Sequence, residues 1–255
     1  MKNAEILNRR EQIVTIIRSA GKINTEEAAA MFGVSKETIR QDLLYLSHEG
    51  IIKKVYGGAV LCKNDRIESL PIRETVNFLT KDKIARTAAK YLPEGECIIG
   101  MDMGSTVALL GTYLSRRRDL LVITNSHRVL QTLVTTENRT LSLGGEYNKE
   151  EMAYYSDEIP SLVKNLTLDL YFMGTSGVKG RGGVCTKGFQ ESFIKNQLIQ
   201  RSKKKIVLAD SSKFQTTSLI EVAPWSSLDL LITDEDIPAD IKKDLEQYIP
   251  VVIAQ

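Results

Sequence analysis

Apolar residues in the first fifty positions recur at helical spacing in three short stretches. The predicted buried faces are Ile13, Ile16, Ile17 and Ala20, then Ala28, Ala29, Met31 and Phe32, then Ile39, Leu43 and Leu46. A glycine follows each stretch, at Gly21, Gly33 and Gly50. Because glycine readily adopts the left-handed backbone that ends a helix, the pattern predicts three helices with glycine stops.

The second and third predicted helices begin with residues that can cap them. Asn24 offers an acceptor at the N-cap with Glu27 three residues on, and Ser35 is a natural cap for the third helix. Ala28 and Ala29 are small enough for two helices to cross closely. Two short helices separated by a glycine turn match the helix-turn-helix pattern, whose second helix enters the major groove of DNA.

Residues 51–60 have β-forming side chains on both sides of Gly57-Gly58 and predict a hairpin around a Gly-Gly turn. With Lys53, Lys54 and Tyr56 on it, this hairpin would contact the DNA backbone as a wing. Small three-helix units also serve as protein–protein modules, and most exposed Lys and Arg side chains are simply solvated. The ordered combination of capped helices and basic hairpin favours a winged helix-turn-helix DNA-binding domain over residues 1–60.

The third predicted helix carries the side chains best suited to reading bases. Arg40 and Gln41 can make bidentate contacts with guanine and adenine, and hydroxyls or amides near the helix start can hold phosphates. The candidate DNA-binding residues are Thr25, Ser35, Lys36, Glu37, Thr38, Arg40, Gln41, Lys53, Lys54, Tyr56 and Gly57. Double-stranded operator DNA is therefore the expected partner.

The hydrophobic pattern changes after residue 60. Residues 61–80 are polar, contain Pro71 and lack a sustained period, so they predict a linker, and a helix over about 81–92 follows. Continuous apolar stretches then alternate with helical ones. The main strand candidates are 97–101, 120–124, 140–143, 168–173, 206–208 and 228–233. This alternation predicts an α/β domain over residues 81–255, with a mostly parallel sheet covered on both faces.

Small polar residues follow four of the predicted strands. In parallel sheets ligands bind beyond the carboxyl ends of the strands, where helix N-termini offer free amides to anions. Gly-Ser-Thr at 104–106 suits an anion, and Lys213 adds a cation suited to phosphate. Each loop alone is more simply a turn and an N-cap, but four together favour an anionic effector. The candidate effector-binding residues are Asp102, Gly104, Ser105, Thr106, Thr124, Asn125, Ser126, Gly144, Gly145 and Lys213.

Composition narrows the remaining function classes. The 34 basic and 32 acidic side chains give a net charge of +2, which neither demands nor forbids nucleic acid. Cys62, Cys97 and Cys185 are odd in number and widely spaced, and there are two histidines, so we expect no disulfide framework, metal or cofactor. No apolar run approaches the roughly 18 residues of a membrane span, so we expect a cytoplasmic protein without membrane contact.

Several motifs resemble one family of bacterial regulators. Residues 34–43 and 56–59 are similar to the N-terminal motif of the DeoR family, with Gln41 where that family usually has Arg. Segments 103–106, 122–126, 143–145, 208–214 and 232–234 resemble its sensor domain, and Tyr154 to Asp157 stand where the family commonly has a glycine. The resemblance implies a sensor similar in fold to ribose-5-phosphate isomerase and glucosamine-6-phosphate deaminase. It also implies a phosphorylated sugar with Gly104 to Thr106 near the phosphate, and Asp102, Asn125 and Lys213 among its neighbours.

The leading hypothesis is a transcription regulator rather than an enzyme. A homodimer or homotetramer would place paired recognition helices on an operator, and a phosphorylated sugar would bias that arrangement. The resemblance implies a repressor of a carbohydrate-use operon. The alternative is a sugar-phosphate isomerase or deaminase with a DNA-binding appendage. Asp102, Asp210 and Lys213 could serve it, but the sequence shows no unambiguous acid–base constellation. A scaffold that does not bind DNA fits poorly with the helix after Ser35.

Overall fold

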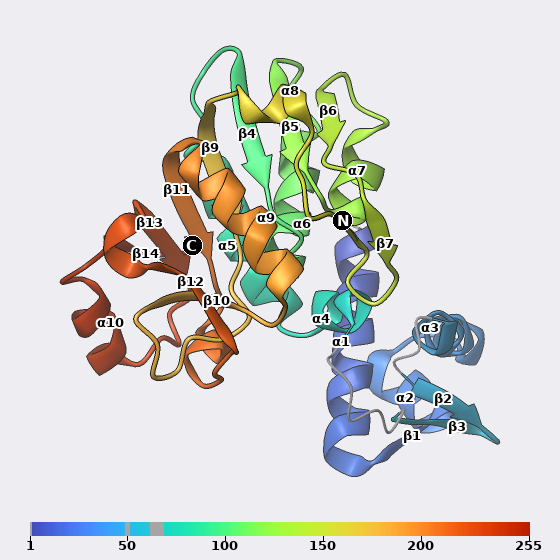
Figure 1. Cartoon of the computed structure of the whole chain (residues 1–255). Helices are drawn as coiled ribbons and strands as arrows, with labels where there is room; N and C mark the ends of the chain where they lie inside the picture. The colour runs from blue at the N-terminus through green and yellow to red at the C-terminus, as the bar shows by residue number, and fades with distance from the viewer. Residues whose placement is uncertain (1, 49–51, 62–68) are drawn as a thin grey trace. The chain divides into compact units, whose positions relative to one another are not determined.

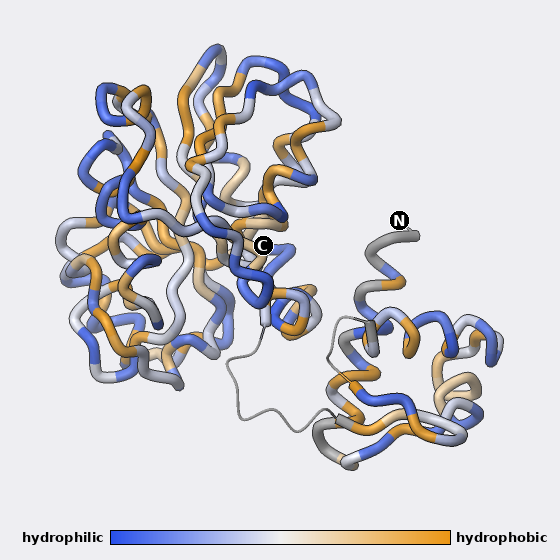
Figure 2. Tube along the Cα trace, turned by 45° about the vertical axis from the view of Figure 1, so that its right-hand side comes forward, coloured by the Kyte–Doolittle hydropathy of each residue, from blue (hydrophilic) through white to orange (hydrophobic). Residues whose placement is uncertain are grey.

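The computed structural model describes residues 2–48, 52–61 and 69–255 (Figure 1). Contacts within the chain divide it into two units, residues 1–79 and residues 80–255. In Figure 2 hydrophobic segments gather inside each unit, and hydrophilic ones form the turns and loops.

The first unit contains three helices, a small sheet and one further short helix. Its elements are α1 (Lys2–Ala20), β1 (Lys22–Asn24), α2 (Thr25–Phe32), α3 (Lys36–His48), β2 (Ile52–Val55), β3 (Gly58–Leu61) and α4 (Leu70–Thr75). The three predicted helices are confirmed. Their apolar faces form one core that includes Ile17, Ala28, Ile39 and Leu43. Gly21 and Gly33 have φ of 75° and 63°, as helix stops require; Gly50 lies outside the described residues.

The predicted turn at Gly57-Gly58 is displaced by one residue. Val55 pairs with Gly58 across β2 and β3, so the turn is Tyr56-Gly57. Gly58 instead pairs with Asn24 of β1, in an antiparallel sheet of order β1-β3-β2. A Cβ at Gly58 would lie 1.9 Å from the carbonyl oxygen of Ile23, so this glycine permits the close approach of β1.

The segment predicted as a linker is partly helical. Helix α4 contacts α1, and Ile72 packs against the core of the first unit. Residues 62–68 of the predicted linker lie outside the described residues. The helix predicted over 81–92 is α5 (Phe78–Ala89), so it begins and ends three residues earlier.

The second unit is an α/β domain around a seven-stranded sheet. In spatial order the strands are β14 (Val251–Ile253), β13 (Leu230–Thr233), β11 (Ser202–Leu208), β9 (Leu168–Met173), β4 (Cys97–Met101), β5 (Leu120–Thr124) and β6 (Arg139–Ser142). All six pairings are parallel. The predicted fold class is confirmed.

Helices cover both faces of this sheet (Figure 1). On one face lie α5, α6 (Ser105–Leu114) and α7 (His127–Leu133), and on the other α8 (Ser161–Lys164), α9 (Phe189–Gln200) and α10 (Ala239–Leu245). Neighbouring strand residues alternate between the faces: Phe172 and Ile206 belong to the first core, and Tyr171 and Val207 to the second.

Two small antiparallel sheets and two short 3-10 helices complete this unit. The sheets pair β7 (Glu146–Asn148) with β8 (Ala153–Tyr155), and β10 (Gly183–Thr186) with β12 (Ile220–Pro224). The 3-10 helices are η1 (Ser211–Phe214) and η2 (Trp225–Ser227). Neither small sheet is predicted by the sequence pattern.

The order of the strands fixes where a ligand is expected. From β4 the chain proceeds to β5 and β6 in one direction, and from β9 it proceeds to β11, β13 and β14 in the other. The topological switch point is therefore the crevice beyond the carboxyl ends of β4 and β9, which is where open α/β sheets bind ligands.

Candidate DNA-binding and effector sites

The start of α3 is fixed by the cap that the sequence predicts. The amide of Thr38 donates to Oγ of Ser35 over 3.0 Å, and the two hydroxyl oxygens are 2.8 Å apart. This cap sets the first turn of α3, in which Lys36 and Glu37 are exposed, and Arg40 follows one turn later, also exposed.

Glu37 accepts hydrogen bonds from both residues that are predicted to read bases, Arg40 and Gln41. Nε2 of Gln41 donates to Oε1 of Glu37 over 3.0 Å, and Nη1 of Arg40 lies 3.4 Å from its Oε2. The hydrogen bond from Gln41, followed by that from Arg40, lowers the pKa of the Glu37 carboxyl. Lys36 forms an ion pair with Glu26 of α2. Carboxylates of the same unit thus hold the exposed side chains of Lys36, Arg40 and Gln41.

A buried carboxylate holds this helix against α1. Asp42 is 2% exposed and accepts from Nε of Arg9 over 2.6 Å and from Nε of Arg10 over 2.9 Å. The Arg10 guanidinium also lies 3.7 Å from the centroid of the Tyr45 ring. Asp42 therefore has a structural part in presenting α3.

The hairpin lies beside the first turn of α2. The amide of Thr25 donates to the Gly57 carbonyl over 2.9 Å, and Gly57 has a φ of 77°. Lys53, Lys54 and Tyr56 are exposed on the same hairpin. The structure thus brings the eleven predicted DNA-binding residues onto the two capped helices and the hairpin of one unit.

An ion pair lies at the switch point of the larger sheet. Asp102 follows β4 and Gly174 follows β9. The Gly174 amide donates to Oδ2 of Asp102 over 3.1 Å. Nζ of Lys195, from α9, donates to the same Oδ2 over 2.5 Å and to the Gly174 carbonyl over 2.8 Å. Lys195 is 1% exposed, so this pair is a buried part of the site.

The N-terminus of α6 opens at the same strand end. The first amide bonded within this helix is that of Ala108, which donates to the Gly104 carbonyl over 2.8 Å. The amides of 105–107 therefore lack an acceptor within the helix and can receive an anion. A Cβ at Gly104 would stand 3.7 Å from Cα of Gly174, so the two loops of the switch point are adjacent.

Asn125 contributes a buried acceptor beside this helix N-terminus. It is 1% exposed, its Nδ2 donates to the Tyr154 carbonyl over 3.2 Å, and the same nitrogen is 3.8 Å from Sδ of Met103. Because the Tyr154 carbonyl requires a donor, the orientation of the amide is determined. Its Oδ1 is buried and has no hydrogen-bond partner among the described residues. Such an unpaired acceptor costs about 1–3 kcal/mol, which a ligand donor would recover.

Three other predicted residues have structural roles: two form hydrogen bonds within the protein, and one glycine permits a close approach of the backbone. Oγ1 of Thr124 donates to the Met101 carbonyl over 2.7 Å, and Oγ of Ser126 caps α7 by accepting from Val129 over 3.2 Å. A Cβ at Gly145 would lie 2.0 Å from the Tyr155 carbonyl oxygen, so this glycine is needed for the fit of β8. Gly144 and Gly145 stand before β7, and Lys213 stands on η1 after β11, the neighbour of β9.

Two polar residues of this region escape the sequence prediction. Lys195 follows Ile194 and precedes Leu198 on the buried face of α9, a spacing that could have drawn attention to it. Tyr171 of β9 is fully buried, and its hydroxyl has no hydrogen-bond partner among the described residues. Burial, and then the Asp102 and Glu191 carboxylates, raises the pKa of Tyr171.

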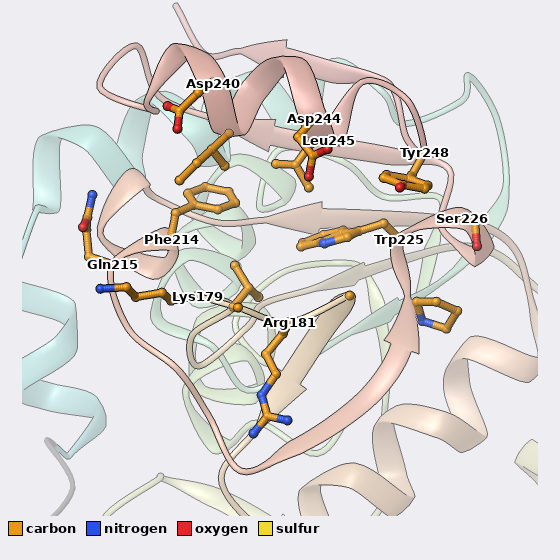
Figure 3. A pocket seen from close by; sticks show the side chains of 15 residues that line it. Lys179, Arg181, Phe214, Gln215, Trp225, Ser226, Asp240, Asp244, Leu245 and Tyr248 are labelled. Atoms are coloured by element: carbon orange, nitrogen blue, oxygen red, sulfur yellow. The ribbon is translucent and has the colours of Figure 1, made fainter.

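A separate cavity of about 740 Å³ lies among the loops near α10 (Figure 3). Phe214, Trp225 and Tyr248 give it aromatic walls, with Asp244 and Lys179 among its charged lining residues. None of the ten predicted effector-binding residues lines it. Its size suits a small molecule, although its charged side chains are exposed and solvated.

The part of the chain that the structure describes shows neither a metal-binding cluster nor a membrane span. There, no three His, Cys, Asp or Glu side chains gather in a way that could hold a metal ion. Nor does a described helix combine the length and apolar character that crossing a membrane requires.

Comparison with known proteins gives matches along nearly the whole chain. The family model for the DeoR C-terminal sensor domain matches residues 76–235, and that for the DeoR-like helix-turn-helix domain matches residues 9–65. A protein of Escherichia coli named for transcriptional repression of the aga operon is 30% identical over 243 residues, covering 94% of this chain and 90% of the relative. An L-fucose operon activator of Haemophilus influenzae is 31% identical over 242 residues, covering 94% and 96%.

A more distant relative and a solved structure complete the comparison. A glycerol-3-phosphate regulon repressor of Escherichia coli is 26% identical over 241 residues, covering 94% of this chain and 95% of the relative. Among solved structures, ribose 5-phosphate isomerase A of Methanocaldococcus jannaschii matches with a TM-score of 0.40 and 20% identity. That match spans about half of each chain, 54% in both cases.

Proposed function

Because the chain belongs to the DeoR family of transcription regulators, as its motifs predict, we propose that it represses a carbohydrate-use operon and that a phosphorylated sugar alters its operator binding. Its relatives are named as regulators of the aga operon, of an L-fucose operon and of a glycerol-3-phosphate regulon, and they include repressors and an activator. Repression, as the direction of regulation, and a phosphorylated sugar, as the effector, are both part of what we propose.

The proposed contact with DNA uses α3 and the hairpin. Arg40 and Gln41 would leave Glu37 and bind base edges in the major groove, since guanidinium and amide groups suit guanine and adenine. Lys53, Lys54 and Tyr56 would contact the backbone, where contacts position the protein without reading sequence. A homodimer or homotetramer would place two such helices on successive half-sites.

The observation that carries the effector assignment is the unpaired Oδ1 of Asn125 next to the free amides of α6. An anion fits the helix N-terminus, and a hydroxyl donor fits the amide oxygen. A phosphorylated polyhydroxy compound carries both groups in one molecule. Ser105 and Thr106 would add hydroxyls to the phosphate, and Lys213 a positive charge.

We place the effector at the switch point rather than in the cavity near α10. The switch point holds buried polar atoms that need partners, whereas the charged residues that line the cavity are exposed to solvent. Gly144 and Gly145 would shape the wall nearest β7, while Thr124 and Ser126 would hold the loop in which Asn125 lies.

The test is a titration of fluorescent DNA from the promoter region of the protein's own gene with the full chain at fixed salt. Glucose 6-phosphate, fructose 1-phosphate and glycerol 3-phosphate are then added in turn. Specific binding that one of these weakens supports the proposal. Specific binding that none of them, nor any other sugar phosphate, changes would overturn the effector assignment. Turnover of a sugar phosphate by the purified chain would favour the isomerase or deaminase alternative.

A further inference from the structure

The ammonium group of Lys195 joins three elements at the switch point. Its Nζ reaches Oδ2 of Asp102 after β4 over 2.5 Å and the carbonyl of Gly174 after β9 over 2.8 Å. On its own helix α9, Oε1 of Glu191 lies 3.9 Å away. The side chain of Lys195 is 1% exposed. One buried lysine therefore links the two loops that follow the paired strands of the switch point.

Stability alone does not account for a buried ion pair of this kind. Removing an ammonium and a carboxylate from water carries a desolvation cost that their attraction barely recovers. Well-packed apolar side chains of similar volume often serve stability equally well or better. The Lys195–Asp102 pair lies at the expected ligand crevice, where a fixed carboxylate has a use that an apolar pair could not supply.

The pair determines which oxygen of Asp102 is available. Oδ2 accepts from both Lys195 and the Gly174 amide. Oδ1 accepts no hydrogen bond within the described residues, and the side chain is 6% exposed. The carboxylate is therefore anchored through one oxygen and keeps the other for a ligand, beside the helix that begins after Gly104.

We propose that Lys195 is a positioning residue of the effector site. It fixes the Asp102 carboxylate so that Oδ1 accepts a hydrogen bond from a hydroxyl group of the phosphorylated effector. Asp102 and Asn125 then supply two acceptors for hydroxyl groups, while the amides of α6 hold the phosphate. Lys195 thus serves recognition of the carbon skeleton, through Asp102, and leaves recognition of phosphate to α6. This inference rests on the proposed function of the same site.

Binding calorimetry on the full chain tests this division of roles. The probes are glucose 6-phosphate, fructose 1-phosphate and glycerol 3-phosphate, with inorganic phosphate as the probe that lacks a carbon skeleton. Lys195→Met should weaken binding of the sugar phosphate that the wild type prefers by about tenfold, which is the effect of one lost hydrogen bond. The affinity of the variant for inorganic phosphate, measured by competition, should differ from that of the wild type by less than about twofold. The control is Lys179→Met, which removes an exposed lysine of the cavity near α10 and should change neither.

A second comparison separates positioning from direct contact. The double variant Asp102→Asn with Lys195→Met should bind the sugar phosphate no more weakly than Asp102→Asn alone, because Lys195 acts through Asp102. If circular dichroism shows that Lys195→Met does not fold, Lys195→Gln replaces it. Glutamine keeps one donor for Asp102, so we then expect a smaller loss of about threefold.

Three results would overturn the positioning role. The first is unchanged sugar-phosphate binding in the Lys195 variant, and the second is an equal loss of affinity for sugar phosphate and for inorganic phosphate. The third is a double variant that binds the sugar phosphate more weakly than Asp102→Asn does. The last two would indicate that Lys195 contacts the ligand itself. If the wild type binds no sugar phosphate at all, the proposed function fails instead, so the two failures are distinguishable.

Discussion

Asn125 and Tyr154 exchange two hydrogen bonds, although 29 residues separate them along the chain. The Tyr154 amide donates to the Asn125 carbonyl over 2.8 Å, and Nδ2 of Asn125 donates to the Tyr154 carbonyl over 3.2 Å. The exchange joins the end of β5 to the hairpin of β7 and β8. Oδ1 of Asn125 takes no part in this exchange and has no hydrogen-bond partner among the described residues, so it is the acceptor that we propose for the effector.

Replacing Asn125 should impair the response to effector more than binding to DNA. In Asn125→Ala the acceptor for the effector and the donor to Tyr154 are both lost, so we expect about tenfold weaker binding of the active sugar phosphate. Operator affinity without effector should change by less than about twofold, because Asn125 lies in the second unit. Calorimetry and operator titration measure the two quantities. Gln131→Ala on the exposed side of α7 is the control, and equal effects of both variants would contradict the assignment.

Arg40 and Lys54 should differ in how they affect operator binding. Arg40→Ala removes a predicted base contact and should cost about 1–3 kcal/mol on the cognate operator, with relaxed specificity at one position. Lys54→Ala removes a predicted phosphate contact, so it should weaken binding to all DNA sequences alike. It should also reduce the slope of log affinity against log salt by about 1. Binding to a set of single-base operator variants at several salt concentrations checks both. A uniform loss for Arg40→Ala would reassign it to the backbone.

Removing the Asp42 carboxylate should loosen the first unit. Asp42→Asn takes away the charge that binds Arg9 and Arg10, so we expect a loss of about 2 kcal/mol in the stability of the α1–α3 contact. Hydrogen exchange should then speed up in α1 and α3 and stay unchanged in the larger sheet. Asp157→Asn, an exposed aspartate of the second unit, is the control. Equal exchange rates in α3 of wild type and Asp42→Asn would show that the pair does not stabilise this unit.

Much of the fold follows from patterns that are local in sequence. The strand at 97–101 is a continuous apolar run because both faces of the sheet are covered, and its prediction is confirmed. By contrast β7 has three exposed residues in a row, so no hydrophobic alternation marks it. The local pattern places Gly58 in a turn, because nothing near it in the sequence indicates the pairing with β1, whose residues lie more than thirty positions earlier.

In the candidate site, too, some residues can be predicted from the local sequence and others depend on contacts between distant segments. Gly104 to Thr106 stand at a strand end and could be predicted from the loop alone. The role of Lys195 could not, because its spacing on α9 marks it only as a residue of the apolar face. Its ion pair depends on the loops after β4 and β9, and the farther partner is 93 residues away. A lysine in helix α9 is ordinarily a solvated side chain, and only the tertiary structure shows its ion pair with Asp102. The features that long-range contacts create are the ones that sequence patterns leave out.

The acid limb of the stability profile should depend on Asp169. Its Oδ1 pairs with Lys203 over 2.8 Å, and its Oδ2 accepts from the Ile98 amide over 2.9 Å, which ties β9 to β4. The Lys203 hydrogen bond, and then the Ile98 amide, lowers the pKa of the Asp169 carboxyl. The folded state therefore releases this proton more readily than the unfolded state, whose aspartate pKa is about 3.9. The contribution is present above that pH and is lost as pH falls through the lower folded value.

The matching variant is Asp169→Asn. With the side chain about one-third exposed, we expect it to reduce the free energy of unfolding by roughly 1 kcal/mol at pH 7, and by progressively less as the pH falls below about 4. Thermal unfolding of wild type and variant, followed from about pH 7, where the carboxyl is ionised, down to about pH 3, below its unfolded pKa of about 3.9, gives both curves. Parallel curves over this range would mean that the Asp169 charge is not linked to folding, whereas curves that converge toward acid pH would establish the link between β9 and β4 as an ionised contact.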